Sequence, residues 1–547
     1  MDRRRPRQVR RLLRSVLAAA ALGGLPVLLA LGFFASRFAG LTDSSALEQA
    51  QLARQIARGE GFSTQVLTPL DLARVPVSGR GRDFRYAPLY PLLLSRVVGT
   101  EGARDNPVGL LSLGFWLATV ALTCAFAWRL FGGRAAAVAT VLLVVNVTLL
   151  REAISGRETL AWAFAVGVWL FLTHELASLP GAEGSWWLPA SSGAVFGVCC
   201  LLSYQSLALL APALIVPALL APARRGRTCL IFLGAVLVVA APWLIRNLVT
   251  AGNPLFSLSW WAVATNTESH PGDTVLQWSD PGAGGPLVYA FVHAGEVVRK
   301  FALGLARLRD GLFATTDAYV MAMFLLGAMM GRWQENAARL RTGVCILLLA
   351  AAPTALGSGH PRVFAPLVPV VTIFAVQFFL ERLERLQLGF RISADRRLRS
   401  GTMRTAALYL ALAIAVYPLV VAFATAPYQY YDPARPAPFE NLRERIPEGA
   451  TVLTNFPWHV AWYTDRRAVL LPRTTAELAG IEQRLGRVDW LLLSPPLHAQ
   501  LISGDPVWSE LYSRTGHAAA GFAAGQHMSI APGLTVVVRP REAVEER

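Results

Sequence analysis

Long apolar segments with almost no charge are the feature of this sequence that most restricts its fold. A helix needs about 20 apolar residues to cross the hydrocarbon core of a bilayer, where a single charge costs several kcal/mol. Only 16% of the 547 residues are charged, too few to cover the surface of a soluble chain of this length. The sequence therefore predicts an α-helical polytopic membrane protein with about 11 transmembrane helices, at residues 14–36, 106–130, 134–150, 158–177, 188–204, 206–222, 228–248, 312–331, 342–358, 363–381 and 403–426.

Two of these segments allow a second interpretation. Segments 188–204 and 206–222 are separated only by a short polar stretch around Gln205, so they could form one kinked re-entrant unit. The first segment, with its arginine-rich flank, could be a cleaved signal peptide. Its apolar run is long and no A-x-A site follows before Leu41, so we expect a retained span.

Arginines in the short loops predict the orientation, because positively charged loops stay in the cytoplasm. The formal charge of +16 falls mostly in such loops. Residues 1–13 are then a basic cytoplasmic N-terminus, and 14–427 form the transmembrane domain. Outer loops 37–105 and 249–311 lie on the opposite side, together with the tail. This threading predicts a location in the bacterial cytoplasmic membrane.

The tail has the composition of a soluble domain. Residues 450–454 and 488–493 read as buried strands, 474–486 as a helix, and 522–528 and 534–538 as further strands. Residues 428–547 are therefore expected to form a small C-terminal α/β extracytoplasmic domain. It contains no phosphate loop and no obvious catalytic group, so we expect it to bind an acceptor or to cover an outer cavity.

Two carboxylates stand at the outer ends of predicted helices. Asp43 follows the first span and precedes a helix over 46–58, which an S-x-x-E capping box at 45–48 would begin. Glu158 opens the fourth span, behind a second capping box at 155–158. Both are candidate catalytic carboxylates facing one outer cavity, and a role as helix caps is the alternative.

Two arginines lie on the outer side, against the charge trend of the loops. Arg246 ends the seventh span, and Arg362 follows the glycine-rich stretch 357–360. A fixed guanidinium at such a position can bind a phosphate group, and snorkelling toward the interface is the alternative. Further candidates for the lining of a substrate cavity, with simple membrane anchoring as the alternative for the two tyrosines, are Tyr86, Tyr90, Glu152 and His360.

The order of these features resembles the membrane-embedded GT-C glycosyltransferases. It is most similar to the bacterial branch related to protein O-mannosyltransferases (glycosyltransferase family 39) and lipid A aminoarabinose transferase. Each motif is weak alone, and their order and common side carry the resemblance over nearly all of the membrane part. The matching pieces are Asp43 with the helix ending at Phe62, the segment Pro88–Leu93, Glu158, Pro242–Asn247 with Gly252–Pro254, and Arg362 ahead of Pro366 and Pro369.

The resemblance implies a transferase that moves a sugar from a polyprenyl-phosphate-linked donor to a lipid, glycan or protein acceptor at the outer membrane face. It implies that Asp43 takes the proton of the acceptor hydroxyl and that Glu158 orients the acceptor. Arg362, with Arg246, would hold the leaving phosphate. The partners are then the donor, the acceptor and membrane lipids, and no nucleic acid.

No cofactor is predicted. Many relatives carry two adjacent acids where this chain has Asp43-Ser44. The sequence therefore gives no support for a divalent metal at this position, although it does not decide whether one binds. The five cysteines lie in apolar segments without a CxxC pair, which indicates neither a zinc site nor a disulfide.

Two other classes of protein share the sequence features. A flippase or transporter of lipid-linked sugars is also polytopic, although we find neither inverted repeats nor charges near the middle of the spans. A non-catalytic membrane assembly factor with the same fold is the second alternative, favoured by the departure at Ser44.

Overall fold

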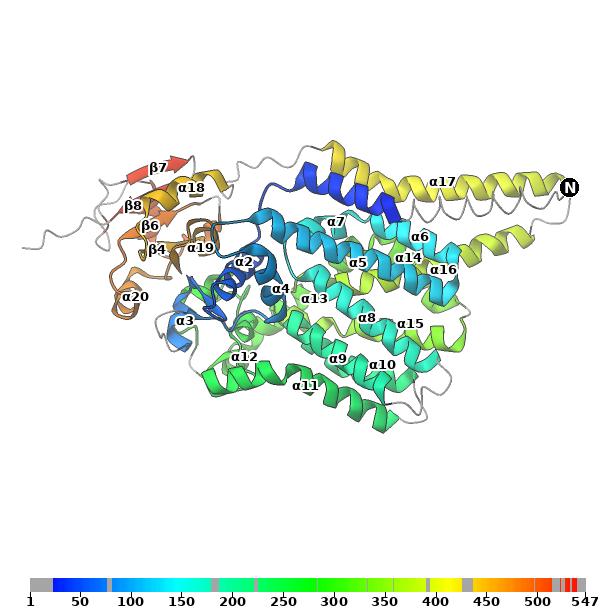
Figure 1. The fold of residues 1–547 in the computed structure, drawn as a ribbon, viewed down its shortest axis with the longest axis horizontal. Helices are drawn as coiled ribbons and strands as arrows, with labels where there is room; N and C mark the ends of the chain where they lie inside the picture. Colours follow the sequence, from blue (N-terminus) through cyan, green and yellow to red (C-terminus); the bar gives the residue numbers. More distant parts are fainter. Residues whose placement is uncertain are drawn as a thin grey trace, which may run out of the picture.

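The computed structural model describes residues 23–75, 81–178, 186–220, 225–282, 284–331, 333–357, 359–389, 394–425, 436–495, 497–513, 522, 527–531 and 534–538. The predicted cytoplasmic segment 1–13 and the first part of the first span lie outside these ranges. The described chain folds into a large helical body with a strand-containing module at one end (Figure 1).

The helical body follows the apolar segments of the sequence. After a helix at Gly23–Arg37, its long helices are α5 (Asp105–Phe131), α6 (Gly133–Val144), α7 (Val147–Ile154), α8 (Thr159–Ser178), α9 (Trp187–Leu202), α10 (Leu210–Leu220), α11 (Arg225–Ala251), α13 (Ala294–Thr316), α14 (Ala318–Met330), α15 (Glu335–Leu349), α16 (Val368–Gly389) and α17 (Ala394–Ala424). Short 3-10 helices continue several of them, among them η2 (Tyr204–Leu209) before α10 and η7 (Pro361–Leu367) before α16.

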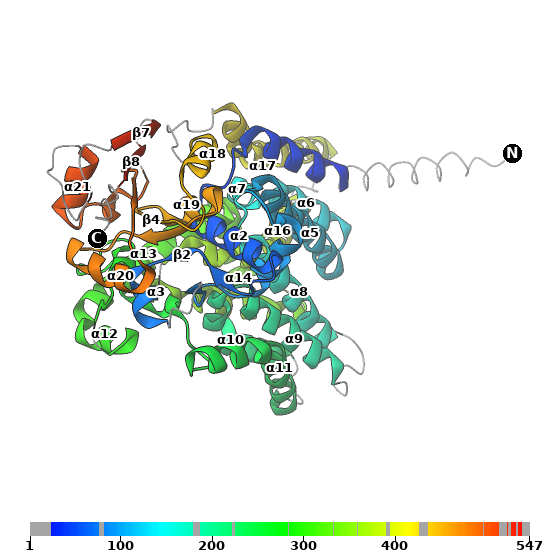
Figure 2. The same cartoon turned by 60° about the vertical axis from the view of Figure 1, so that its left-hand side comes forward.

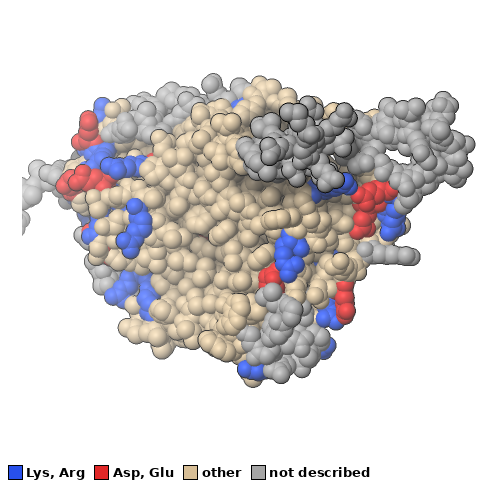
Figure 3. Space-filling model, turned by 45° about the vertical axis from the view of Figure 1, so that its right-hand side comes forward, with Lys and Arg blue, Asp and Glu red and all other residues tan. Residues whose placement is uncertain are grey.

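Apolar surface surrounds this body. By length and composition, 5 described helices can cross a membrane, or up to 7 if each of two bent pairs is one span, and shorter apolar helices accompany them. The described parts of the predicted spans fall on helices, but 134–150 covers the bent pair α6 and α7, and 312–331 covers the bent pair α13 and α14. The number of spans stays a prediction. Figure 3 shows a broad face without charged side chains, bordered by arginines and acidic residues toward its two ends. The chain is a helical membrane protein.

Two bends interrupt the helical body, and their polar residues meet. Helices α6 and α7 meet at 61°, and α13 and α14 at 100°. Asp317 lies at the second bend with φ 64, a conformation in which a helix cannot continue. The Asn146 side chain, at the first bend, donates to Asp317 Oδ2 at 2.9 Å. The predicted span 312–331 is therefore broken, and α13 begins well inside the predicted outer loop 249–311.

The module at the end of the body is a six-stranded sheet with the order β2-β5-β4-β6-β8-β7. Its strands are β2 (Val66–Leu67), β4 (Thr451–Thr454), β5 (Arg467–Leu470), β6 (Trp490–Leu493), β7 (His527–Ala531) and β8 (Leu534–Val538). The first four of these in the sheet are parallel, and β8 and β7 are antiparallel. Strands β4, β6 and β8 agree with the predicted strands. Strand β2, however, comes from the first outer loop, so the sheet is built from two distant parts of the chain.

A helix of the tail fixes this module to the first outer loop. Helix α19 (Pro457–Thr464) packs against α2 (Ser44–Ala57) (Figures 1 and 2). The buried Arg54 guanidinium of α2 donates to the carbonyl oxygens of Ala461 and Trp462 at 2.7 and 2.8 Å. It also pairs with Asp465 at 3.2 Å. The tail is thus hydrogen-bonded to α2 and does not hang free.

Gln277 makes a similar connection from the second outer loop. It lies at the end of η5 (Thr274–Gln277) and is fully buried. Its side-chain amide donates to the carbonyl oxygens of Leu471 and Leu501 at 3.0 and 2.6 Å. Residues of the two predicted outer loops and of the tail therefore meet at one end of the helical body.

Candidate active site

The first carboxylate of the site is held by the start of a helix. Asp43 is the N-cap of α2, and its Oδ1 accepts from the backbone N–H groups of Ser45 and Ala46 at 3.0 and 3.4 Å. The expected capping box with Ser45 as the cap is wrong by two residues. Because Oδ1 is used by the cap, Oδ2 is the oxygen that is left for other partners.

A tight turn brings the first arginine to this oxygen. Gly156 has φ +78, and a Cβ on it would lie 2.7 Å from Leu41 Cδ2 and 2.9 Å from Val108 Cγ1. Only glycine fits here. The turn that follows α7 then directs Arg157 at Asp43, with Nη1 2.6 Å from Oδ2.

The second arginine arrives from the other half of the chain. Arg362 lies in η7, and its Nη2 is 3.5 Å from Asp43 Oδ2. Its Nε donates to Glu152 Oε1 at 2.8 Å. One guanidinium therefore joins two carboxylates that are more than a hundred residues apart in the sequence.

Glu158 is part of the same group through a glutamine. Gln49 Nε2 donates to Glu158 Oε2 at 2.7 Å and to Ser45 Oγ at 3.1 Å. Gln49 and Ser45 share a face of α2 because they are four residues apart. The expected capping box at 155–158 is absent, since Ser155 is instead the C-cap of α7.

Electrostatics keep Asp43 ionised. Burial raises the pKa of Asp43, but the charges of Arg157 and Arg362 and the hydrogen bonds outweigh it, so this pKa lies below its usual value. His360 lies beside Arg362, accepting its backbone N–H at Nδ1. Partial burial and the nearby arginines lower the pKa of His360 to about 4, so this ring is neutral.

Two polar atoms of the group have no partner among the described residues. These atoms are Glu152 Oε2 and Arg157 Nε, and both are buried. A buried polar atom without a hydrogen bond costs about 1–3 kcal/mol. One acceptor and one donor are thus free beside Asp43. We name Asp43, Glu152, Arg157, Glu158 and Arg362 the outer charge cluster.

The other predicted site residues take different places. Arg246 lies over the rings of Phe84 and Trp243, 4.3 and 4.6 Å from their centroids, and donates to the Asp83 carbonyl oxygen at 2.9 Å. These contacts fix the loop before α4 (Leu89–Val98) and do not join Arg246 to the outer charge cluster. Arg246 thus has protein partners of its own, and its expected role beside Arg362 at a donor phosphate stays a prediction.

The two tyrosines also differ from each other. Tyr90 is fully buried, and its hydroxyl donates to the Gly156 carbonyl oxygen at 2.9 Å, so it supports the turn and lines no open space. Tyr86 is half-buried, and burial, together with nearby Glu48, raises its pKa. It lies next to the start of α2.

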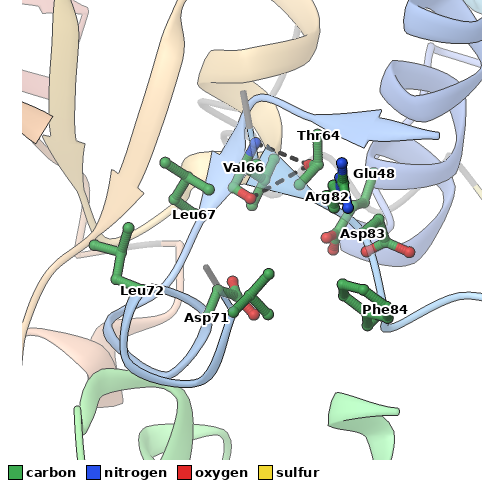
Figure 4. A pocket seen from close by; sticks show the side chains of 11 residues that line it. Glu48, Thr64, Val66, Leu67, Asp71, Leu72, Arg82, Asp83 and Phe84 are labelled. Carbon is green, nitrogen blue, oxygen red and sulfur yellow. Dashed lines mark hydrogen bonds between the residues drawn. The ribbon is translucent and has the colours of Figure 1, made fainter. Parts of the chain in front are cut away.

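A second group of acids lies deeper, below α2 (Figure 4). Glu48 and Asp83 are both almost fully buried around a small cavity, and Asp71 lies across it. Arg85 faces all three, 2.8 Å from Asp71 and 3.8 Å from Glu48. Burial raises the pKa of Glu48 to about 7 and that of Asp83 to about 6.

The tail contributes residues that the sequence did not indicate. Trp458 donates from Nε1 to Glu48 Oε2 at 2.8 Å, and its ring lies 5.1 Å from that of His498. Neither residue has a recognisable motif around it. The aromatic run at 456–463 was the only available signal, and its partner on α2 depends on the tertiary fold.

The described residues contain no group of three or more His, Cys, Asp and Glu side chains that could hold a metal ion. In the outer charge cluster each carboxylate faces an arginine or a glutamine amide. The structure thus adds no support for the divalent metal that the sequence left open.

Comparison with solved structures gives the class of fold. Over nearly its whole length, the chain has the GT-C fold of membrane glycosyltransferases. No family model and no curated protein matches the sequence.

The individual matches are distant in sequence. ArnT from Cupriavidus metallidurans, bound to undecaprenyl phosphate, matches with a TM-score of 0.57 at 14% identity, covering 95% of this chain and 98% of ArnT. AglB, an archaeal oligosaccharyltransferase from Archaeoglobus fulgidus in complex with an inhibitory peptide and a dolichol-phosphate, matches with a TM-score of 0.56 at 13% identity, covering 91% and 72%. AglB has also been solved with Zn and sulfate, with a TM-score of 0.53 to this chain. The fold expected from the order of motifs is confirmed.

Proposed function

We propose that this protein is a glycosyltransferase that moves a sugar from a polyprenyl-phosphate-linked donor to a hydroxyl of a lipid, glycan or protein acceptor, at the outer face of a bacterial cytoplasmic membrane. The observation that carries the proposal is the outer charge cluster. An N-cap carboxylate, two arginines and two further carboxylates come together there from separate segments, at the end of the helical body where the outer loops meet.

The contacts support a role for each residue. Asp43 is ionised and fixed by its cap, so it is a defined acceptor for the proton of an attacking hydroxyl. The acceptor oxygen forms a bond to the anomeric carbon, the bond from that carbon to the phosphate oxygen breaks, and the polyprenyl phosphate leaves. Arg362 holds the leaving phosphate, because its contact with Asp43 at 3.5 Å is the longest in the cluster and is easily exchanged.

Glu152 and Arg157 orient the two groups. Glu152 keeps the Arg362 guanidinium in place at 2.8 Å. Arg157 has a free buried Nε, which can donate to the donor phosphate or to an acceptor oxygen. Glu158 is held by Gln49 and faces the cluster. There it is a second carboxylate that can accept a hydrogen bond from a hydroxyl of the acceptor substrate. The fold supports the lipid donor, since ArnT and AglB were solved with undecaprenyl phosphate and dolichol-phosphate.

The test is transfer from a radiolabelled polyprenyl-phosphate sugar in membranes that contain the full chain. Asp43→Asn should lower the rate by a factor of about 100 or more, because the base is lost while the cap is kept. Asp310→Asn is the matched control, since Asp310 is about 71% exposed. Full activity of Asp43→Asn would rule out the assigned base, and movement of the lipid across the membrane without transfer would favour the flippase.

Arg362 is tested by donor binding. Arg362→Ala should weaken binding of undecaprenyl phosphate by about tenfold or more, and Arg362→Lys should restore part of it, because lysine keeps the charge without the planar fork. Arg309→Ala, at an exposed position, is the control. Equal affinity of Arg362→Ala and the unchanged protein would contradict the phosphate contact.

A further inference from the structure

A polar groove lies between the far end of α2 and the tail, at a distance from the outer charge cluster. It has a volume of about 290 Å³. One wall is formed by residues 55–65, which end α2 and enter the short strand β1 (Ser63–Thr64), and the other by residues 448–449 and 465–467 of the tail. Gln55 is twelve residues beyond Asp43, so at 1.5 Å per residue the groove begins about 18 Å along the helix from the candidate base.

Three residues of this groove carry a buried polar atom with no partner in the described part of the chain. These atoms are Gln55 Nε2, Ser63 Oγ and Gln65 Oε1. Gln55 is 2% exposed and Ser63 6% exposed. Leaving such an atom without a hydrogen bond destabilises the protein unless something binds to it. Their concentration in one wall of one groove indicates a ligand that supplies both donors and acceptors.

The charges of the groove exclude an anion as its main ligand. Three arginines (Arg58, Arg466, Arg467) stand against three acids (Glu60, Glu448, Asp465). Arg58 forms a two-bonded pair with Asp465 at 3.0 and 2.5 Å. Arg466 donates to the carbonyl oxygens of Ile446 and Arg443. The groove therefore has no net charge and no unopposed cation for a phosphate.

The lining also differs from that of a peptide site. Every lining residue is charged, an amide, a hydroxyl or glycine, so the groove has no apolar pocket for a side chain. Each hydroxyl of a sugar can both donate and accept a hydrogen bond. Neighbouring sugar hydroxyls can therefore pair with an amide N–H, a hydroxyl and an amide oxygen.

We propose that this groove binds an uncharged oligosaccharide. The binding itself does not depend on the proposed transfer reaction. If that reaction is correct, α2 joins the two sites. An acceptor glycan would then lie in the groove while its end reaches Asp43.

The experiment is titration of the full chain in lipid nanodiscs, without any donor, by isothermal titration calorimetry. The probes are mannotetraose and maltotetraose as uncharged glycans, tetragalacturonate as an anionic one, and a hexapeptide of glycine, serine and threonine. We expect saturable binding of at least one uncharged tetrasaccharide. Binding of the anion or the peptide alone, or of no uncharged probe, overturns the proposal.

Two variants locate the site. Gln55→Leu should weaken tetrasaccharide binding about tenfold, the value of one lost hydrogen bond to a buried group. Its melting temperature should not fall, because leucine removes an amide N–H that lacks a partner. Thr274→Val is the control, since Thr274 also has a buried, unpartnered side-chain atom but does not line the groove. Equal losses in the two variants would overturn the assignment.

Two more variants keep the result interpretable. Ser63→Ala should weaken binding in the same way if Gln55→Leu does not fold. Asp43→Asn should leave tetrasaccharide binding within about twofold while it lowers transfer about 100-fold or more. In the unchanged protein, transfer without tetrasaccharide binding would contradict this proposal alone, and tetrasaccharide binding without transfer would contradict the proposed function alone.

Discussion

The two oxygens of Asp43 do different work, and this division decides how the residue can be studied. Oδ1 accepts the backbone N–H groups at the start of α2, and Oδ2 faces Arg157 and Arg362. The sequence presented the helix cap and the catalytic base as alternatives. The structure contains the cap, and the geometry leaves the second oxygen available for the proposed chemistry.

We expect Asp43→Asn and Asp43→Ala to differ in stability. Asparagine is as good an N-cap as aspartate, whereas alanine lowers helix stability by about 1 kcal/mol. Thermal unfolding of the purified variants in detergent should therefore rank Ala below Asn. Identical melting temperatures would show that the cap does not contribute.

Glu48 gives a prediction about pH. Its folded-state pKa of about 7 lies above the ordinary value of 4.5, because burial disfavours the charge, and Arg85 offsets this only in part. The stability from neutral Glu48 is therefore complete below about pH 4.5 and is lost as the pH rises through about 7. Nearby Asp83 and Asp71 add to the effect through repulsion.

The comparison that isolates this effect is Glu48→Gln against the unchanged protein. Glutamine keeps an acceptor for the Trp458 indole and does not titrate. Between pH 5 and pH 8 the variant should gain about 2–3 kcal/mol relative to the unchanged protein, from about 1.4 kcal/mol for each unit of pKa difference. Chemical unfolding at both pH values measures it, and a difference that does not change with pH would contradict the buried, neutral carboxyl.

At the scale of elements, the turn between α7 and α8 positions two of the charges in the cluster, Arg157 and Glu158. Gly156→Ala introduces a Cβ at φ +78, within 3 Å of two side chains. We expect a loss of about 1–3 kcal/mol in stability from the strained backbone and the overpacking. Transfer activity should fall as well, because Arg157 moves with the turn.

Gly449→Ala is a suitable control for this substitution. Gly449 also has a positive φ, but a Cβ there would meet no atom within 4 Å. Gly449→Ala should therefore lower the stability only by the contribution of backbone strain, without the contribution of overpacking. If both variants lost the same amount, the close packing around Gly156 would carry no energy.

The contact between α2 and α19 is the second element-scale feature with a measurable consequence. Arg54 is fully buried, and its removal leaves the carbonyl groups of Ala461 and Trp462 without this donor, while Asp465 keeps its pair with Arg58. Arg54→Met should therefore cost about 2–6 kcal/mol, from about 1–3 kcal/mol for each carbonyl group. Arg74→Met, which breaks an exposed pair with Asp280, should cost less than about 1 kcal/mol.

Proteolysis distinguishes local from global effects of Arg54→Met. If α19 fixes the tail, the tail of this variant should be cleaved much faster than the helical body, with Arg74→Met unchanged. Uniform cleavage of both parts would contradict a local role.

At the scale of the whole molecule, hydropathy predicted the helical body because long apolar runs have few alternatives in a bilayer. The predicted tail strands at 450–454, 488–493 and 534–538 were also found, since each is a short and mostly apolar segment. Of the predicted strand 522–528, residues 523–526 lie outside the described ranges, and β7 covers His527–Ala531. Strand β2 has only two residues, and no local pattern could show that Val66–Leu67 pairs with a strand of the tail. The same limit applies to Gln49 and Trp458, whose partners are set by tertiary packing.

Arginines show both the strength and the limit of the sequence argument. Arg362 and Arg246 were singled out for the same reason, a positive charge on the outer side. Arg362 joins the outer charge cluster, but Arg246 is surrounded by aromatic rings and fixes a loop. The charge of an arginine and the side of the membrane on which it is expected predict that it needs a partner. They do not determine whether that partner is a ligand or another part of the protein.

The pairing of β2 with β5 also affects how the protein is made. Val66 pairs with Ala468, about 400 residues later in the chain. At a synthesis rate of about 5–20 residues per second, the first outer loop waits on the order of 20–80 s for its partner strand. During this time the buried face of α2 is uncovered while the spans are being inserted. Completion of the sheet is thus a late step of biogenesis, and a chain that stops before β5 leaves an open strand edge that quality-control proteases and chaperones can recognise.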